Sequence, residues 1–316
     1  MSRSEFDLIQ NFKNRFSLDR VGDDCAVLPK DGRTDLLVTA DMLVEDIDFR
    51  LEWTSAEMLG HKALAVSLSD IAAMGGRPAW AMLTIGIPDE LWKTDLLDRF
   101  YDGWFSLARR FDVELVGGDI SRTPDKIVID SIVGGDVEKG RAILRSTAKI
   151  GDAIFVSGTL GGAAGGLRLL ESGHRIKDNH VDPVVKKQLR PQPQLSAANL
   201  LQDLNIVTSM IDISDGLSSD LSHICESSRV GAQLLADSIP VDPDLSTHFD
   251  TEARLDMALN GGEDLQLLFT VSEENIPKLN SPDFTRVGEI TANVGIIELS
   301  NAGELRKLPP KGFQHF

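Results

Sequence analysis

The stretch Met210-Ile211-Asp212-Ile213-Ser214-Asp215-Gly216 decides how this chain is interpreted. An apolar run over residues 206–213 predicts a buried strand, and residues 217–225 carry apolar side chains at helical spacing. Ser214 or Asp215 is then a candidate helix N-cap. Capping does not account for Asp212, because an unpaired charge inside a buried strand is costly. A cation bound by both aspartates is the simplest explanation.

Carboxylates accompany other strand-like runs in the same way. One run ends on Asp41, a second is followed by Gly118 and Asp119, and Asp24 lies in a turn before a third. Each reads as a carboxylate on a loop at the end of a strand. Such oxygen-only ligands suit hard cations such as Mg²⁺ or Ca²⁺, and Mg²⁺ often shares its shell with substrate phosphates. The sequence therefore predicts a site with several Mg²⁺ ions that binds a phosphorylated ligand.

A long helix is predicted over residues 54–75. Thr54 and Glu57 have the spacing of a capping box, and Gly75 ends the segment. The helix is apolar nearly all round, which is typical of a buried helix. Asp70 in its last turns needs a partner. That partner is either a cation from elsewhere in the chain or a metal ion, and the other aspartates favour the metal.

Composition limits the function classes. The chain has 316 residues, a hydrophobic content of 42% and a formal net charge of −17. The length favours two domains, which we place at residues 1–137 and 138–316. The negative charge argues against a nucleic acid or an anionic membrane as the main partner. Two distant cysteines and a start without signal-peptide character favour a reduced, cytoplasmic location.

Strands and helices alternate in the first 135 residues, which predicts an α/β domain with more than one crossover. In the second half, Arg145 is either a phosphate ligand or an ordinary surface arginine. The glycine-rich segment 158–167 is a phosphate cradle or, as we prefer, a tight strand–helix turn. A glycine pair presents Glu263 and Asp264 before an apolar strand, and solvated turn acids are the alternative there.

The order of these motifs resembles the thiamine-monophosphate kinase family, within the superfamily of aminoimidazole ribonucleotide synthetase. Any one motif would be weak, whereas eight in the same order are specific. They are Gly22–Ala26, Thr39–Glu45, Ala65–Gly75, Val116–Asp119, Gly140–Ser146, Ile211–Gly216, Asn260–Asp264 and Lys311–Phe316.

The resemblance implies an α/β (α+β) fold of two domains, with the N-terminal sheets pairing across a homodimer. It implies ATP-dependent phosphorylation of thiamine monophosphate to thiamine diphosphate, with Mg²⁺ as the cofactor. The family's magnesium ligands match Asp24, Thr39, Ala40 (through its backbone), Asp41, Asp70, Asp119, Asp212 and Asp215. Its ATP-binding positions match Gly118, Asp119, Arg145 and Ser214. Its substrate-contacting positions match Asp48, Glu263 and Phe313.

The chemistry agrees with this assignment. Phosphoryl transfer depends on in-line positioning and charge neutralisation. The acceptor is a phosphate oxygen that is already ionised, so no general base is needed. We therefore expect Asp24, Asp41, Asp119, Asp212 and Arg145 to carry the catalysis. The resemblance further implies that Phe313 lies against the cationic rings of the substrate and that Glu263 faces their charge.

Three other functions fit parts of the pattern. One is a different ATP-dependent phosphotransferase or synthetase of the same superfamily. The second is a metal-dependent phosphohydrolase, and the third is a divalent-ion binding protein without catalysis. Formation of ADP that depends on an acceptor separates the kinase from the last two.

Overall fold

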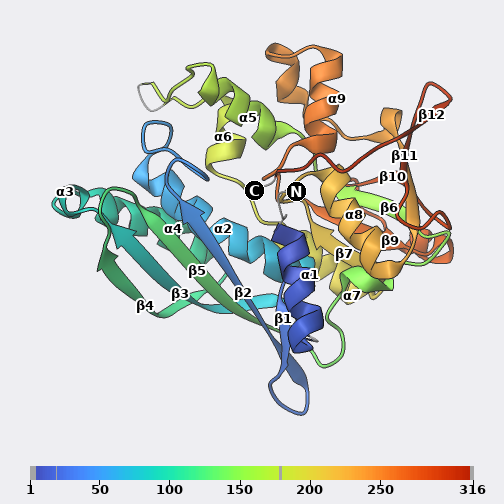
Figure 1. The fold of residues 1–316 in the computed structure, drawn as a ribbon, viewed down its shortest axis with the longest axis horizontal. Coiled ribbons are helices and arrows are strands. Elements are labelled where there is room, and N and C mark those ends of the chain that lie inside the picture. The colour runs from blue at the N-terminus through green and yellow to red at the C-terminus, as the bar shows by residue number, and fades with distance from the viewer. Residues whose placement is uncertain (1–4, 19, 178–179, 314–316) are drawn as a thin grey trace.

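The computed structural model describes residues 5–18, 20–177 and 180–313, and these form two sheets side by side with helices between and around them (Figure 1). The last three residues of the predicted C-terminal motif lie outside the described residues. The first sheet has the strand order β1-β2-β5-β3-β4. Its strands are β1 Ala26–Pro29, β2 Thr34–Val44, β3 Arg77–Ile87, β4 Glu114–Arg122 and β5 Val128–Glu138.

The connections of the first sheet confirm the predicted crossovers. β2 and β3 are both antiparallel to β5 between them, so they run in the same direction, and β3 is parallel to β4. Helices therefore connect β2 to β3 and β3 to β4. They are α2 Ala56–Ala73, α3 Asp89–Trp92 and α4 Leu96–Arg110. The connection from β3 to β4 thus contains two helices, α3 and α4.

The second sheet has the order β12-β11-β8-β10-β6-β9-β7 and is antiparallel except where β11 meets β8. Its strands are β6 Ala153–Ser157, β7 Val207–Asp212, β8 Gly231–Leu235, β9 Leu267–Val271, β10 Phe284–Thr291, β11 Ile297–Asn301 and β12 Glu304–Lys307. The helices of this half are α5 Gly162–Glu171, α6 Pro183–Leu189, α7 Leu195–Leu204, α8 Leu217–Ser228 and α9 Thr251–Asn260.

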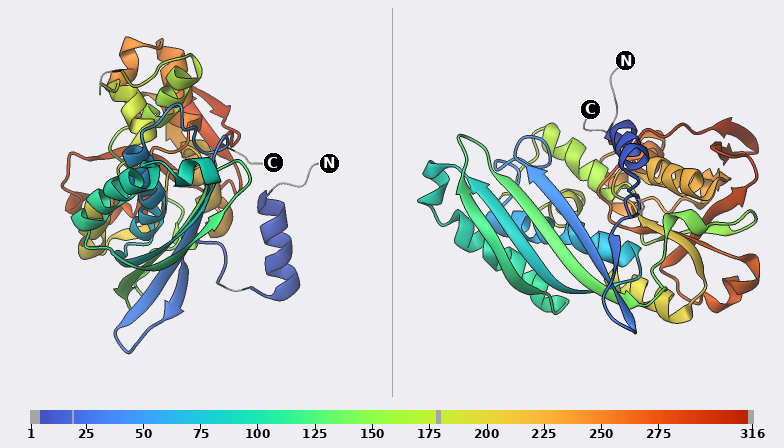
Figure 2. Two further views of the ribbon diagram at one scale, coloured as in Figure 1. Left: turned by 90° about the vertical axis from the view of Figure 1, so that its left-hand side faces the viewer. Right: turned by 60° about the horizontal axis from the view of Figure 1, so that its bottom comes forward.

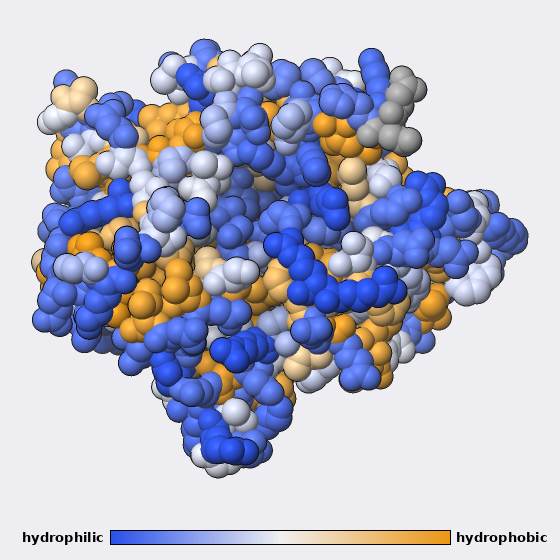
Figure 3. Space-filling model, turned by 180° about the vertical axis from the view of Figure 1, so that it is seen from behind, coloured by the Kyte–Doolittle hydropathy of each residue, from blue (hydrophilic) through white to orange (hydrophobic). Residues whose placement is uncertain are grey.

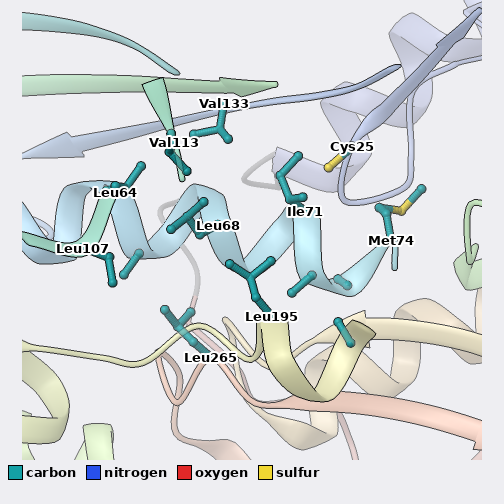
Figure 4. Close-up of a cluster of buried hydrophobic side chains, with 14 of the residues drawn as sticks. Cys25, Leu64, Leu68, Ile71, Met74, Leu107, Val113, Val133, Leu195 and Leu265 are labelled. Atoms are coloured by element: carbon teal, nitrogen blue, oxygen red, sulfur yellow. The ribbon is translucent and has the colours of Figure 1, made fainter. Parts of the chain in front are cut away.

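Helix α2 lies between the two halves of the molecule. In Figure 4, Val133 of the first sheet is on one side of the helix, and Leu195 and Leu265 of the second half are on the other. Leu64 and Leu68 of α2 are completely buried. The prediction of a buried helix is confirmed, although its N-cap is Ser55, which accepts from Met58 N, and not Thr54. One of the hydrophobic clusters thus contains residues of both halves and fixes α2 between them.

One face of the first sheet is covered and the other is not. Figure 2 shows α2 and α4 on the covered face, with the separate N-terminal helix α1 (Glu5–Phe16) beyond the opposite face. Met42 is 62% exposed and Met82 is 41% exposed on the uncovered face. This sheet therefore presents large apolar side chains that nothing in the described part of the chain buries.

The surface agrees with the composition. The face in Figure 3 is mainly hydrophilic, with hydrophobic patches separated by hydrophilic residues. Among the helices of the described residues, none has the length and apolar character needed to cross a membrane. Cys25 and Cys225 are both buried and unpaired as thiols.

Candidate functional site

Three aspartates from distant parts of the chain meet beside α2. Asp24 precedes β1, Asp70 lies in the last turns of α2, and Asp212 ends β7. One carboxylate oxygen from each lies within 4.8 Å of the others. Asp24 and Asp212 are buried, and Asp70 is partly buried. This all-oxygen donor set, which we call the carboxylate cluster, fits a hard divalent cation such as Mg²⁺.

Hydroxyl groups orient these carboxylates and the neighbouring Asp41. Ser67 Oγ donates to Asp41 at 2.7 Å, and Ser69 Oγ donates to Asp212 at 2.5 Å. Thr39 Oγ1 donates to Asp70. Asp41 lies inside β2 on the face toward α2, and not on a loop as predicted, so the sheet and the helix together hold its side chain. Hydrogen bonds of this kind, from groups that do not bind the metal themselves, fix the direction in which the ligand oxygens point.

The electrostatics of the cluster are unfavourable without a cation. Burial raises the pKa of Asp212 to about 7 and that of Asp41 to about 6. Burial and repulsion by Asp41 and Asp212 raise the pKa of Asp70 well above its usual range. Removing carboxylates from water and placing them together disfavours their charged forms. A bound cation would reverse this effect.

Arg145 is the cation that contacts the carboxylate cluster. It lies in a short 3-10 helix, Arg145–Thr147, and its Nη2 is 2.5 Å from Asp24 Oδ1. Its backbone N–H donates to Asp23 at 2.8 Å. Burial raises the pKa of Asp24, and the Arg145 guanidinium opposes that rise. Arg145 is therefore fixed in the site and is not an ordinary surface arginine.

The junction after β7 is built differently from the predicted cap. Helix α8 has Gly216 at its N-cap position, without a side-chain cap. Instead, Asp220 within the helix accepts from the backbone N–H groups of Asp215 and Gly216. Ser214 and Asp215 are thereby left to line a pocket.

That pocket has a volume of about 820 Å³ and lies between the two halves of the molecule. The predicted site residues on its wall come from both halves. They are Asp41, Asp48, Asp70, Asp212, Ser214, Asp215, Glu263 and Phe313. The carboxylate cluster therefore opens into a space large enough for a small organic ligand.

The predicted substrate-contacting residues are held on this wall by specific contacts. Asp48 lies in a turn after β2, where its carboxylate accepts from Val44 N at 2.7 Å. Glu263 forms an ion pair with Lys62 at 2.7 Å. Phe313 is 50% exposed, and its backbone N–H donates to the carbonyl of Asp215 at 3.2 Å. The tail thus returns to the site, as far as the described residues extend.

Gly118 and Asp119 are not near the carboxylate cluster within one chain. They lie inside the edge strand β4 and are exposed. The strand registers place Met42, Asp130, Thr84 and Asp119 in one row across the sheet. Three strand spacings of roughly 4.8 Å separate Asp119 from Met42 by about 14 Å. Asp119 cannot bind the same ion as Asp41 of its own chain. Ala40, on β2, is exposed on the uncovered face.

The glycine-rich segment before α5 is a tight turn, as we preferred. The carboxylate of Asp264 accepts from Gly161 N and Ala163 N at 2.5 and 3.0 Å. A protein carboxylate therefore occupies the place that a phosphate would need at this helix N-terminus. Burial raises the pKa of Asp264 to about 7.

Three polar residues of α2 belong to the site but were not predicted: Lys62, Ser67 and Ser69. A helix that is apolar nearly all round cannot leave polar side chains without partners. The need for a partner was recognised from the sequence for Asp70. It applies equally to Lys62, Ser67 and Ser69.

Two family models cover most of the chain. Residues 22–137 match the N-terminal domain of the AIR synthase related proteins, and residues 149–298 match their C-terminal domain. Among curated proteins, the thiamine-monophosphate kinase of Escherichia coli (strain K12) is 39% identical over 331 aligned residues. That alignment covers 100% of this chain and 99% of the relative.

Solved structures agree with these matches. The structure described as "AaThiL complexed with AMPPCP and TMP" has a TM-score of 0.88 and 32% identity, covering 99% of this chain and 97% of that one. The thiamine-monophosphate kinase from Stenotrophomonas maltophilia K279a has a TM-score of 0.78 and 36% identity, with coverage of 96% and 98%. Full-length identity above 30%, together with the same fold, assigns this chain to the AIR synthase related family and, within it, to the thiamine-monophosphate kinases.

Proposed function

We propose that this chain transfers the γ-phosphoryl group of ATP directly to thiamine monophosphate, giving thiamine diphosphate and ADP, with the help of several Mg²⁺ ions. The carboxylate cluster, which opens into the pocket between the two halves, is the observation that carries this proposal. The solved relative bound to AMPPCP and TMP supports an ATP analogue and thiamine monophosphate as the two ligands.

The residues divide the work of positioning and charge neutralisation. Asp24, Asp41, Asp70 and Asp212 would hold Mg²⁺, with Thr39, the Ala40 carbonyl and Asp215 as further ligands. When bound, Mg²⁺ neutralises the phosphate oxygens that must approach one another. Arg145, held by Asp24, would supply positive charge to the nucleotide phosphates, and Ser214 would lie beside them. The acceptor oxygen is already ionised, so no residue has to remove a proton.

The acceptor end lies on the same pocket wall. Glu263 and the ring of Phe313 would face the cationic rings of thiamine monophosphate. The carboxylate of Asp48 is turned into its own loop by the Val44 N–H. Asp48 thus shapes the loop and keeps its negative charge away from the substrate phosphate.

Gly118 and Asp119 fit this proposal if a second copy supplies them. Their distance from Asp41 excludes a shared ion within one chain, and they lie on a sheet with an uncovered apolar face. We propose that two chains pair through this face, so that Gly118 and Asp119 of the partner subunit complete the nucleotide part of the site. We also propose that the chain divides into two domains, residues 1–137 and residues 138–316.

The first test is a coupled ADP-release assay with Mg²⁺, ATP and thiamine monophosphate, with products separated by chromatography. We expect one thiamine diphosphate for each ADP. The variant Asp212→Asn should lose at least about 100-fold in kcat, because a strong electrostatic contact is removed. Asp203→Asn, at a side chain that is 72% exposed, is the matched control and should keep wild-type activity. Phosphate release without acceptor would instead indicate a phosphohydrolase, and no ADP at all would indicate a binding protein.

A second prediction concerns pH and Mg²⁺. The pKa values of Asp41 and Asp212 are raised in the folded protein, so stability from this source is present at low pH and is lost as pH rises through about 6 to 7. We expect the Tm of the metal-free protein to fall from pH 5.5 to pH 8. Mg²⁺ should raise Tm more at pH 8, where its ligands are ionised. An equal rise in Tm with Mg²⁺ at pH 5.5 and pH 8 would contradict the placement of Mg²⁺ at these carboxylates. So would a dependence of Tm on pH that is the same in Asp212→Asn as in Asp203→Asn.

A third prediction tests the shared site. Asp119→Asn and Asp212→Asn chains carrying different tags are co-expressed, and the mixed dimer is purified through both tags. If each site uses Asp212 of one chain and Asp119 of the other, one of two sites is intact, and kcat per dimer should be about half of wild type. Each variant dimer alone should be inactive. A mixed dimer as inactive as its parents would place both residues in the same chain's site.

A further inference from the structure

Lys62 is a buried cation at the acceptor end of the pocket. It lies on α2, and only 4% of its side chain is exposed. Its Nζ is 2.7 Å from Glu263 Oε1, and it donates to the carbonyl oxygen of Asp48 at 3.3 Å. The structure thus pairs it with two residues predicted to contact the substrate.

Further contacts hold Glu263 in place. Gln188 Nε2, from α6, donates to its second carboxylate oxygen. Its backbone N–H donates to the carbonyl of Ser214 at 2.8 Å. Its φ is +65°, a conformation that non-glycine residues rarely adopt. Strained residues of this kind persist where the surrounding structure fixes them, and they cluster at functional sites.

The two partners differ in exposure. Both line the pocket, but Glu263 keeps 31% of its side chain exposed, whereas Lys62 keeps only 4%. A ligand in the pocket therefore meets much more of the carboxylate side chain than of the lysine side chain. A buried ion pair adds little to stability compared with apolar residues of similar size. Stability alone is thus a weak reason for a lysine in an otherwise apolar helix.

We propose that Lys62 is a positioning residue for the acceptor: together with Gln188 it fixes the carboxylate of Glu263 in the orientation that receives the cationic rings of thiamine monophosphate. The inference rests on the proposed function. Lys62 Nζ contacts both the Asp48 carbonyl oxygen and the Glu263 carboxylate. It therefore connects the Asp48 loop to Glu263 on the other side of the acceptor pocket. Without Lys62, the carboxylate of Glu263 keeps Gln188 as its one hydrogen-bond partner among the described residues, and it can turn away from the ligand.

The experiment measures kcat and both KM values in Lys62→Met, which keeps the length of the side chain and removes its charge. We expect the KM for thiamine monophosphate to rise about tenfold or more, the range for loss of a charge-assisted hydrogen bond. The KM for ATP and kcat should stay within about threefold of wild type, a change too small to reflect a lost electrostatic contact at the reacting groups. Lys62→Arg should restore part of the loss. Lys93→Met, at a lysine that is 69% exposed, is the matched control.

A double-variant cycle separates positioning from general damage. If Lys62 acts through Glu263, adding Lys62→Met to Glu263→Gln should raise the KM for thiamine monophosphate no further. An unchanged or lower KM in Lys62→Met, or additive effects in the cycle, would overturn the inference while leaving the kinase function intact. A parallel loss of kcat, both KM values and Tm would show a structural role only. A wild-type protein that does not use thiamine monophosphate would overturn both proposals.

Discussion

The repulsion between buried carboxylates is the constraint on which the rest of this structure depends. Asp24, Asp70 and Asp212 come from distant parts of the sequence and lie within 4.8 Å in oxygen separation. Like charges removed from water do not remain together unless the surrounding fold holds them or a cation joins them. Helix α2 provides the holding element, because it is fixed between the two halves by a hydrophobic cluster that contains residues of both. The same helix carries Asp70 and the hydroxyl groups of Ser67 and Ser69 that orient the neighbouring carboxylates.

This arrangement brings two chemically different groups of side chains to one site. The carboxylate cluster and Arg145 suit metal-bound phosphates, whose charge the chain, with its formal net charge of −17, would otherwise repel. Glu263 and Phe313 on the pocket wall suit a cationic aromatic ligand. A molecule that joins a phosphate to a cationic ring system matches both groups. Because residues on the wall come from both halves, the packing around α2 determines how the two groups are spaced.

The spacing of apolar residues along the sequence predicted helices and strands well where that spacing was regular. The strand before Ser214 and the buried helix α2 agree with the sequence, and the crossovers follow from the alternation of strands and helices. Errors arose where a short polar motif was interpreted without its tertiary neighbours. Gly117-Gly118-Asp119 lies inside a strand, because pairing with β3 continues through the glycines. The N-cap is Gly216 and not Ser214 or Asp215. Asp220, four residues after Gly216, accepts from the Gly216 N–H and so takes the place of a capping side chain. The partners of Lys62 come from positions 48 and 263, and no local pattern connects them.

The most direct test of this account is to locate the metal ions. Crystals grown with Mn²⁺ in place of Mg²⁺ and with a non-hydrolysable ATP analogue allow anomalous scattering to identify each ion. We expect Mn²⁺ at about 2.1 Å from carboxylate oxygens of Asp24, Asp70 and Asp212, the distance expected for a small hard cation. We also expect this density to be lost in Asp212→Asn. Analogue bound in the pocket with no ion among these three carboxylates would contradict the account.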